Sequence, residues 1–207
     1  MRRTFLTLSR FLIATMLPGS ITVCAAQPSP PLPPSSSPPA LPVFLVNSAD
    51  VLPSDPAWSA ARNEKLAAFK AAYGITFIVS LHAKSPPADE DKIPGAYMRA
   101  LATKLGTAQS GILAVYFADE DDWRLWIGDD LTAQFSGKSG TPKELTESGA
   151  IHDAKEALFA VAITRRDTAF AALQKTAPAD QPPSRARRTQ LHVEALTDAL
   201  IEKFAAR

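Results

Sequence analysis

The chain has 207 residues, 46% of them hydrophobic, which is enough for one domain of ordinary size with terminal segments. A mean hydropathy of −0.03 excludes a protein with several membrane spans. The formal net charge of +1 leaves no basic surplus, so no nucleic-acid partner is expected.

Residues 1–26 have the pattern of an export signal: two arginines, an apolar stretch, and small residues before a cleavage site near Ala25 or Ala26. The paired arginines also resemble the twin-arginine export pattern. Arg10 interrupts the apolar stretch, which favours general secretory export. We therefore expect an exported protein, periplasmic or secreted, with no transmembrane segment in the mature chain.

Cys24 is the only cysteine of the sequence, and it lies inside the expected signal. Lipoprotein anchoring through Cys24 is the minor alternative, because Val23 stands where a lipobox has a small residue. If cleavage follows Ala25 or Ala26, the mature chain has no cysteine and therefore no disulfide or thiolate metal site. Residues 27–42, QPSPPLPPSSSPPALP, are predicted to form a Pro/Ser-rich linker.

The folded part begins at the short apolar run Val43–Val46, which predicts a strand. Asp55 and Pro56 then supply a helix N-cap and a proline at the first helical position. Gly74 is expected to end this helix. The alternating, β-branched run Ile75–Leu81 predicts a strand directly after it.

A second helix is predicted from about Pro94 to Leu105. The run Gly111–Phe117 is apolar without interruption, as expected of a strand buried on both faces. After a short acidic loop, Trp123–Ile127 forms a second β-rich run, in which Trp123, Leu125 and Ile127 point one way and Arg124 and Trp126 the other. The two runs predict a β-hairpin with Trp123 and Trp126 on opposite faces.

The rest of the sequence predicts helices. Residues Thr132–Thr141 are expected to form a glycine-containing loop, followed by a helix over Ile151–Ala162 and another beginning near Asp167. Residues 178–188 are interpreted as a second linker, polar and partly basic. The amphipathic stretch Gln190–Ala206 is expected to pack back on the domain.

Helices between strands imply crossover connections and a mostly parallel sheet, to which the hairpin adds an antiparallel strand. The predicted fold is α/β, an α/β/α layered sandwich with a small mixed sheet and a β-hairpin. Residues 43–177 are assigned to this domain, and residues 178–207 to a linker with a C-terminal amphipathic helix. A monomer is expected.

The order of elements and four short phrases resemble the TPM domain family over about Val43–Leu173. This family includes thylakoid-lumen and photosystem-repair proteins and many exported bacterial proteins. The phrases are residues 46–52 (VNSADVL), 73–79 (YGITFIV), 109–113 (QSGIL) and 124–131 (RLWIGDDL). Asn47 stands where the family usually has Asp, and Asp129 occupies the place of a glycine. The resemblance implies a cell-envelope protein with acid-phosphatase-like activity or calcium binding.

Acidic side chains gather around the predicted hairpin, and carboxylate oxygens are the ligands that calcium and magnesium prefer. The alternative is that the four-residue acidic loop only keeps the hairpin tip solvated. Six residues are candidate ligands for one of these ions: Asp119, Asp121, Asp122, Asp129, Asp130 and Asn47.

Other motifs are weaker. The loop Gly137–Ser139 lacks the first glycine of a P-loop, and the sequence has no Gly-x-Ser-x-Gly nucleophile elbow. His82, His152 and His192 are isolated from one another, without the spacing of zinc ligands. The triplet Arg165–Asp167 could meet an anion, but is more simply interpreted as a helix entry.

The leading hypothesis is an exported TPM-like binding or assembly module of the cell envelope that binds a protein partner or a divalent cation. The alternative is a metal-dependent phosphatase of phosphomonoesters. In that case Asp129 and Asp130 are the metal ligands, and Asn47 or Asp50 converges from the first loop.

Overall fold

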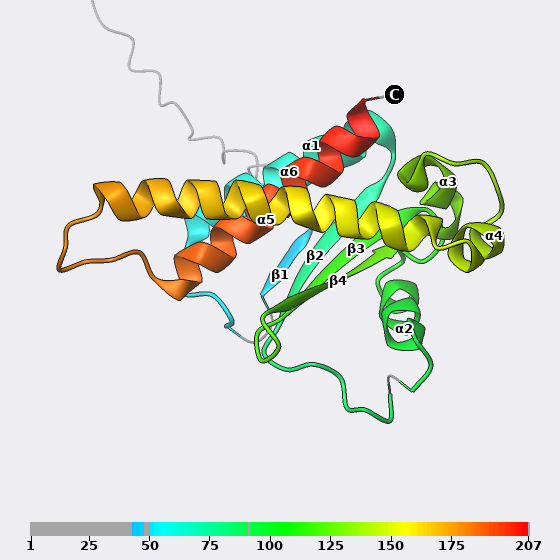
Figure 1. Ribbon diagram of the computed structural model, residues 1–207, viewed down its shortest axis with the longest axis horizontal. Helices are drawn as coiled ribbons and strands as arrows, with labels where there is room; N and C mark the ends of the chain where they lie inside the picture. The colour runs from blue at the N-terminus through cyan, green and yellow to red at the C-terminus, as the bar shows by residue number, and fades with distance from the viewer. Residues whose placement is uncertain (1–42, 48–49, 91, 207) are drawn as a thin grey trace, which may run out of the picture. The chain divides into compact units, whose positions relative to one another are not determined.

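The chain alternates short apolar runs with helical segments, and these runs form one four-stranded sheet with helices on both faces (Figure 1). The structure is a computed structural model that describes residues 43–47, 50–90 and 92–206. The predicted export signal, the Pro/Ser-rich linker and Cys24 lie outside the described residues.

The strands are β1 (Leu45–Asn47), β2 (Thr76–His82), β3 (Gly111–Phe117) and β4 (Asp122–Ile127). The longer helices are α1 (Pro56–Tyr73), α2 (Ala96–Lys104), α5 (Ala150–Thr176) and α6 (Arg185–Ala205). Three short helical segments lie between β4 and α5: η1 (Asp129–Leu131), α3 (Thr132–Ser136) and α4 (Pro142–Glu147).

The order of the strands across the sheet is the same as their order in the sequence, β1-β2-β3-β4. The pairs β1–β2 and β2–β3 are parallel, and β3–β4 is antiparallel. The predicted α/β fold, with a mostly parallel sheet and a hairpin, is therefore confirmed.

Alternate side chains of the central strands enter two separate cores. Phe77, Ile112 and Tyr116 belong to the larger core, which α1, α5 and α6 also line. Leu113 and Phe117 point to the other face, where α2 covers a smaller core. Trp123 joins the larger core and Trp126 packs against the smaller one, as the alternation in β4 predicts.

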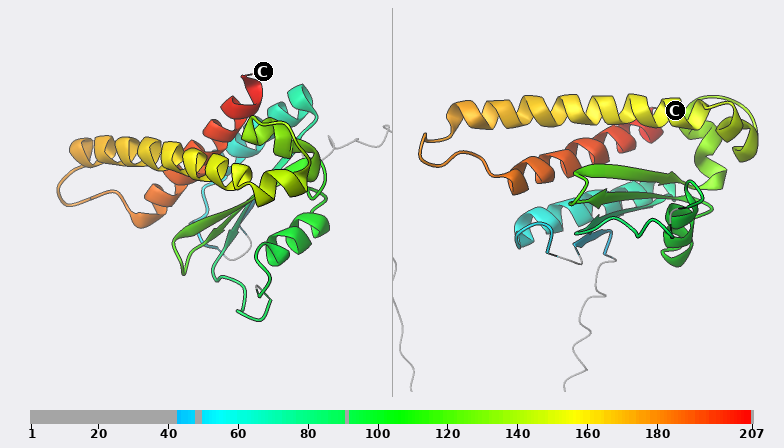
Figure 2. Two further views of the ribbon diagram at one scale, coloured as in Figure 1. Left: turned by 45° about the vertical axis from the view of Figure 1, so that its right-hand side comes forward. Right: turned by 60° about the horizontal axis from the view of Figure 1, so that its bottom comes forward.

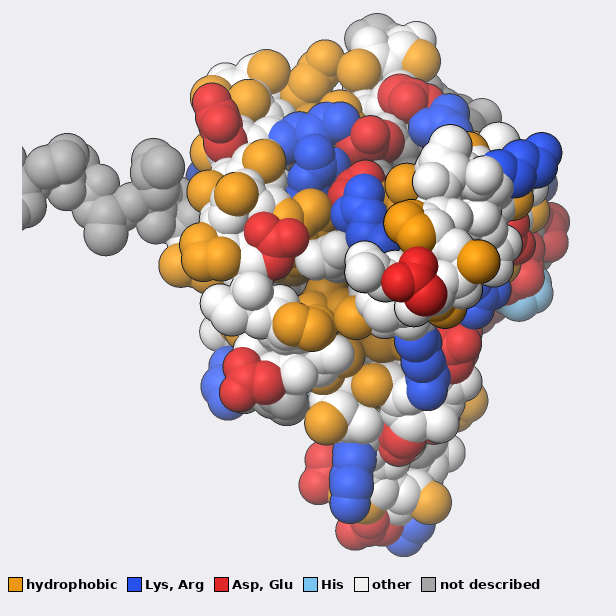
Figure 3. All heavy atoms as spheres, turned by 90° about the vertical axis from the view of Figure 1, so that its left-hand side faces the viewer, with side chains coloured by type: hydrophobic (Ala, Val, Ile, Leu, Met, Phe, Trp, Pro, Cys, Tyr) orange, Lys and Arg blue, Asp and Glu red, His pale blue; other side chains and the backbone are white. Residues whose placement is uncertain are grey.

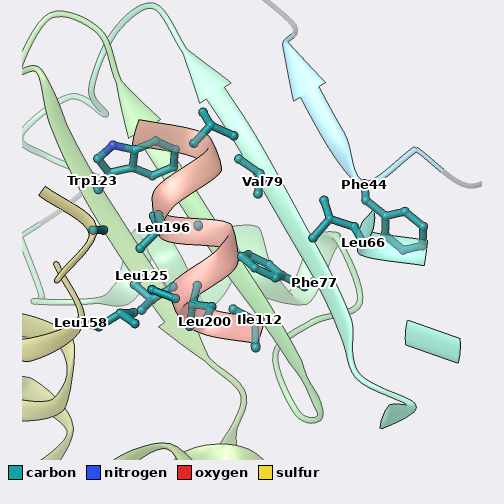
Figure 4. Packing of buried hydrophobic residues seen from close by; sticks show 14 of the residues in the cluster. Phe44, Leu66, Phe77, Val79, Ile112, Trp123, Leu125, Leu158, Leu196 and Leu200 are labelled. Atoms are coloured by element: carbon teal, nitrogen blue, oxygen red, sulfur yellow. The ribbon is translucent and has the colours of Figure 1, made fainter. Parts of the chain in front are cut away.

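α6 contributes most to the larger core. Leu196 and Leu200 are directed at the sheet, next to Phe77 and Leu125, and are 1% and 0% exposed (Figure 4). Figure 2 shows α6 between the sheet and the long helix α5, which forms the outermost layer. The C-terminal helix therefore packs on the domain, as its amphipathic pattern predicts.

Helix α1 has the predicted ends. The carboxylate of Asp55 accepts a hydrogen bond from the amide of Trp58, and Gly74 terminates the helix with a φ of 71°. The helix that was expected to begin near Asp167 does not exist as a separate element. α5 runs unbroken from Ala150 to Thr176, because neither glycine nor proline interrupts it and Asp167 pairs with Arg166 instead of capping a helix.

The prediction of a loop over residues 132–141 is also wrong for its first half, which forms α3. The following helix α4 begins with a capping box, in which the Thr141 hydroxyl accepts from the amide of Glu144 and the Glu144 carboxylate accepts from the amide of Thr141. Among the residues that the structure describes, none of the helices combines the length and the apolar character that a membrane crossing needs.

Candidate functional site

The six predicted metal ligands lie at the two opposite ends of the strands, that is, at the two edges of the sheet where strands begin or end. Asp119, Asp121 and Asp122 are at the β3–β4 turn, whereas Asp129 and Asp130 follow the other end of β4. Six residues of extended chain separate the two groups, a distance of about 20 Å at the rise of a strand. One ion therefore cannot be bound by both groups.

Asp129 and Asp130 lie at the edge where the parallel strands begin. They lie there because β4 is antiparallel and ends beside the start of β3. Ligand sites of open α/β sheets form at the opposite edge, where the parallel strands end. Asp129 faces Arg99, with two nitrogen–oxygen distances of 3.5 Å, and Asp130 accepts a hydrogen bond of 2.9 Å from the side-chain Nε2 of Gln109. Both carboxylates thus contact donors within the protein.

Asp119 makes hydrogen bonds to the segment that follows β2. Its carboxylate accepts the amide of Ser85 at 2.9 Å and the hydroxyl of Ser85 at 3.1 Å. The hydrogen bond from the Ser85 amide, together with that from its hydroxyl, lowers the pKa of Asp119. This carboxylate joins the hairpin tip to the neighbouring loop.

Asn47 has a local structural contact. Its side-chain nitrogen donates to the Leu52 carbonyl over 2.8 Å, and its oxygen accepts the Leu52 amide over 3.3 Å. Asn47 ends the edge strand β1, with β2 and β3 between it and the hairpin tip. Within residues 43–47, 50–90 and 92–206, no three His, Cys, Asp or Glu side chains form a group that could hold a metal ion. The calcium or magnesium site stays a prediction.

A different cluster forms where the hairpin meets α5 and α6. It surrounds a small hollow that is partly open to solvent. The water-accessible space inside is about 10 Å³, roughly the size of one water molecule. The lining side chains come from β3, the hairpin turn and the two helices: Tyr116, Asp121, Arg166, Arg185, Arg188, Thr189 and His192. We call this site the arginine hollow.

The floor of the arginine hollow is built from aromatic groups. The Tyr116 hydroxyl donates to Asp121 over 2.6 Å, and burial together with this carboxylate raises the pKa of Tyr116. His192 is 7% exposed, and its Nδ1 accepts a hydrogen bond of 3.0 Å from the indole nitrogen of Trp123. A terminal nitrogen of Arg166 also lies 3.2 Å from Nδ1.

These donors fix the protonation of His192. Because Nδ1 accepts hydrogen bonds, the neutral ring carries its proton on Nε2. Burial, with the nearby charge of Arg166, lowers the pKa of His192 to about 4, so the ring is neutral at pH 7. Nε2 is buried and has no hydrogen-bond partner among the described residues. His192 therefore lines a polar hollow and also carries a buried N–H group without a partner among the described residues.

The arginines of the site are paired unequally. Arg166 makes two hydrogen bonds to Asp167, of 2.8 and 3.1 Å, and its side chain is 12% exposed. Arg185 and Arg188 reach acidic oxygens only at 3.5 to 3.9 Å, and their side chains are 70% and 36% exposed. Figure 3 faces the side of the molecule where α6 begins and shows basic and acidic side chains interspersed there.

Counting these three arginines against Asp121 and Asp167 leaves the site one positive charge in excess. Asp121, a predicted cation ligand, is therefore surrounded by cationic groups. This environment disfavours a metal ion at Asp121 and favours an anionic ligand.

The sequence contained part of this site. Arg185, Arg188, Thr189 and His192 recur at helical spacing, but residues 178–188 were interpreted as a linker. In the structure, the Ser184 hydroxyl caps α6 and accepts the amide of Arg187. The missed signal was a serine cap followed by a helical repeat of polar residues.

No family model matches the chain, and no curated protein matches it. The resemblance to the TPM domain therefore stays a prediction, and the functional argument rests on the fold and on the arginine hollow.

Proposed function

We propose that the protein is a binding module of the cell envelope that recognises an anionic group of its partner at the arginine hollow. The observation that carries this proposal is the gathering of Arg166, Arg185 and Arg188 around one hollow, where Arg185 and Arg188 reach acidic oxygens only at 3.5 to 3.9 Å. A carboxylate or phosphate oxygen accepts hydrogen bonds from guanidinium groups, and charged acceptors make the stronger bonds.

The hollow is suited to one oxygen atom of a ligand. A polar cavity of this size holds one water molecule, and buried waters make about three hydrogen bonds. An anionic oxygen takes the place of that water, next to His192 and the guanidinium groups that line the hollow. The rest of the ligand then lies at the open side, next to Arg185 and Arg188.

Binding is better supported than hydrolysis. Asp121 already accepts a hydrogen bond from Tyr116 and faces two arginines, so its carboxylate is engaged within the protein. The phosphatase alternative needs Asn47 or Asp50 near Asp129 and Asp130, but Asn47 ends β1 at the opposite edge of the sheet.

Tryptophan fluorescence tests the proposal, because Trp123 contacts His192 directly. The purified protein is titrated with sodium phosphate and with sodium acetate, and ionic strength is held constant with sodium chloride. We expect a saturable change that is absent from the Arg185→Gln/Arg188→Gln variant. Arg165→Gln is the matched control, since Arg165 pairs with Glu202 and does not line the hollow.

A titration without saturation, or equal responses from the double variant and the wild type, would contradict the proposal. A calcium titration of thermal unfolding provides a separate test of the cation prediction. A raised midpoint that is lost in Asp119→Asn would support a metal site at the hairpin tip. A raised midpoint that is lost in Asp129→Asn would support a metal site at the other end of β4.

A further inference from the structure

The outer face of α5 carries a regular pattern of exposed residues. Seven positions, successively four, three, four, four, three and four residues apart, lie on one side of the helix, because each is within about 40° of Thr164 at 100° per residue. All seven are exposed, in a helix that buries only Ala150, Leu158 and Ala162. They are Asp153, Ala157, Ala160, Thr164, Thr168, Ala171 and Lys175. We call them the α5 outer face.

The pattern is symmetric about Thr164. Ala157 and Ala171 are seven positions from the centre, and Asp153 and Lys175 are eleven positions from it. The middle of the face has no charged side chain, whereas its two ends have charges of opposite sign. A second α5 in antiparallel orientation therefore places each Asp153 beside the Lys175 of the other copy.

We propose that two copies of the protein pair through the α5 outer faces, antiparallel and with Thr164 on the two-fold axis. Two-fold pairing brings the same surface of each copy together, so the face must be complementary to itself. The opposite charges at the two ends meet this requirement. Parallel pairing is excluded, because it places Asp153 beside Asp153 and Lys175 beside Lys175.

The middle of the face permits close packing. Alanine side chains let two helix axes approach to the short end of the usual range of about 8–10 Å. The Thr164 hydroxyl donates to the Ala160 carbonyl over 2.8 Å, so it needs no partner when it is buried. Val161, at the side of the face, is 44% exposed, and an apolar hollow there is lined by Ala160, Val161, Thr164 and Arg165.

The helix is accessible for this contact. α5 packs on α6 and also contacts α3 and α4, and it forms the outermost layer over the sheet (Figures 1 and 2). The face spans about 33 Å from Asp153 to Lys175, at the rise of about 1.5 Å per residue. The pairing replaces the expectation of a monomer, and it is independent of the arginine hollow.

Charge reversal tests the pairing by analytical ultracentrifugation over a range of protein concentrations. We expect the wild type to dimerise, and Asp153→Lys or Lys175→Asp alone to weaken dimerisation about tenfold or more, since each makes both ends repulsive. An equimolar mixture of the two variants should dimerise again, because each end then joins a lysine to an aspartate. Glu156→Lys is the matched control on the same helix, outside the face.

A cysteine at the centre tests the register. Facing Cα atoms of helices about 8–10 Å apart lie about 3.4–5.4 Å from each other, which overlaps the range of a disulfide. In a Cys24→Ser background, Thr164→Cys should form a disulfide-linked dimer under mild oxidation, and Glu156→Cys should not. A wild type that stays monomeric at all concentrations, or a mixture no more associated than either variant, would overturn the proposal.

Discussion

The indole nitrogen of Trp123 donates a hydrogen bond of 3.0 Å to Nδ1 of His192, and both side chains are buried. Trp123 belongs to the hairpin and His192 to the last helix, so this contact joins parts of the chain 69 residues apart. It also keeps the imidazole neutral, because a protonated Nδ1 could no longer accept the indole hydrogen.

Stability should fall as the pH decreases through the titration of His192. The folded pKa of about 4 lies below the ordinary histidine value of 6.5, so the unfolded chain binds more protons between these pH values. The loss from pH 7 to pH 4 is on the order of 3 kcal/mol. Urea unfolding at several pH values measures it, with His192→Asn as the variant that lacks the titrating group. Equal pH dependence of variant and wild type would show that His192 titrates normally.

Asn63 holds the edge strand β1 in place. Its side-chain oxygen accepts the amides of Phe44 and Leu45 at 2.7 and 2.9 Å. Asn63→Ala should cost about 1–3 kcal/mol, because both donors lose their acceptor. Hydrogen exchange of these two amides should accelerate as well. Asn63→Asp keeps the acceptor and should lose less, and similar exchange rates in both variants would argue against this role.

Gly128 and Gly74 should respond to alanine for different reasons. A Cβ at Gly128 would lie 2.6 Å from the carbonyl oxygen of Gln109, so Gly128→Ala must displace the backbone. Gly74 has open space around it but a φ of 71°, and Gly74→Ala should cost about 1–2 kcal/mol. We expect the larger loss of unfolding free energy for Gly128→Ala. The reverse order in urea unfolding would contradict the close approach at Gly128.

Leu200 tests how much the core depends on α6. It is fully buried against the sheet, and Leu200→Ala should lower the unfolding free energy by about 2–5 kcal/mol. Ile93→Ala is the control, because Ile93 is 70% exposed and its truncation should change stability by less than about 0.5 kcal/mol. A small loss for Leu200→Ala in thermal or urea unfolding would mean that the rest of the domain is stable without this packing.

Local patterns in the sequence were sufficient to predict much of the fold. The hairpin followed from an uninterrupted apolar run and an alternating one, and the ends of α1 followed from Asp55 and Gly74. Two further signals were present but missed: the unbroken helical composition around Asp167, and the capping residues Thr141 and Glu144.

The site was harder to predict, because its residues meet only through tertiary packing. Asp121 and Asp129 are close in the sequence, but the length of β4 separates them. Asp121 instead meets Arg185 and Arg188, more than sixty residues away, when α6 docks against the hairpin. A local pattern of acidic residues therefore suggested a cation, whereas the folded neighbourhood is cationic.

The matching order of strands in the sheet and in the sequence affects how the chain can fold during synthesis. Each strand pairs with one that has just been made, so the sheet can assemble from local contacts. Helix α1 covers only part of one face of that sheet until α6, which ends at Ala205, has emerged. An unfinished chain thus exposes a large apolar surface, which makes it a substrate for chaperones or proteases until the last helix is in place.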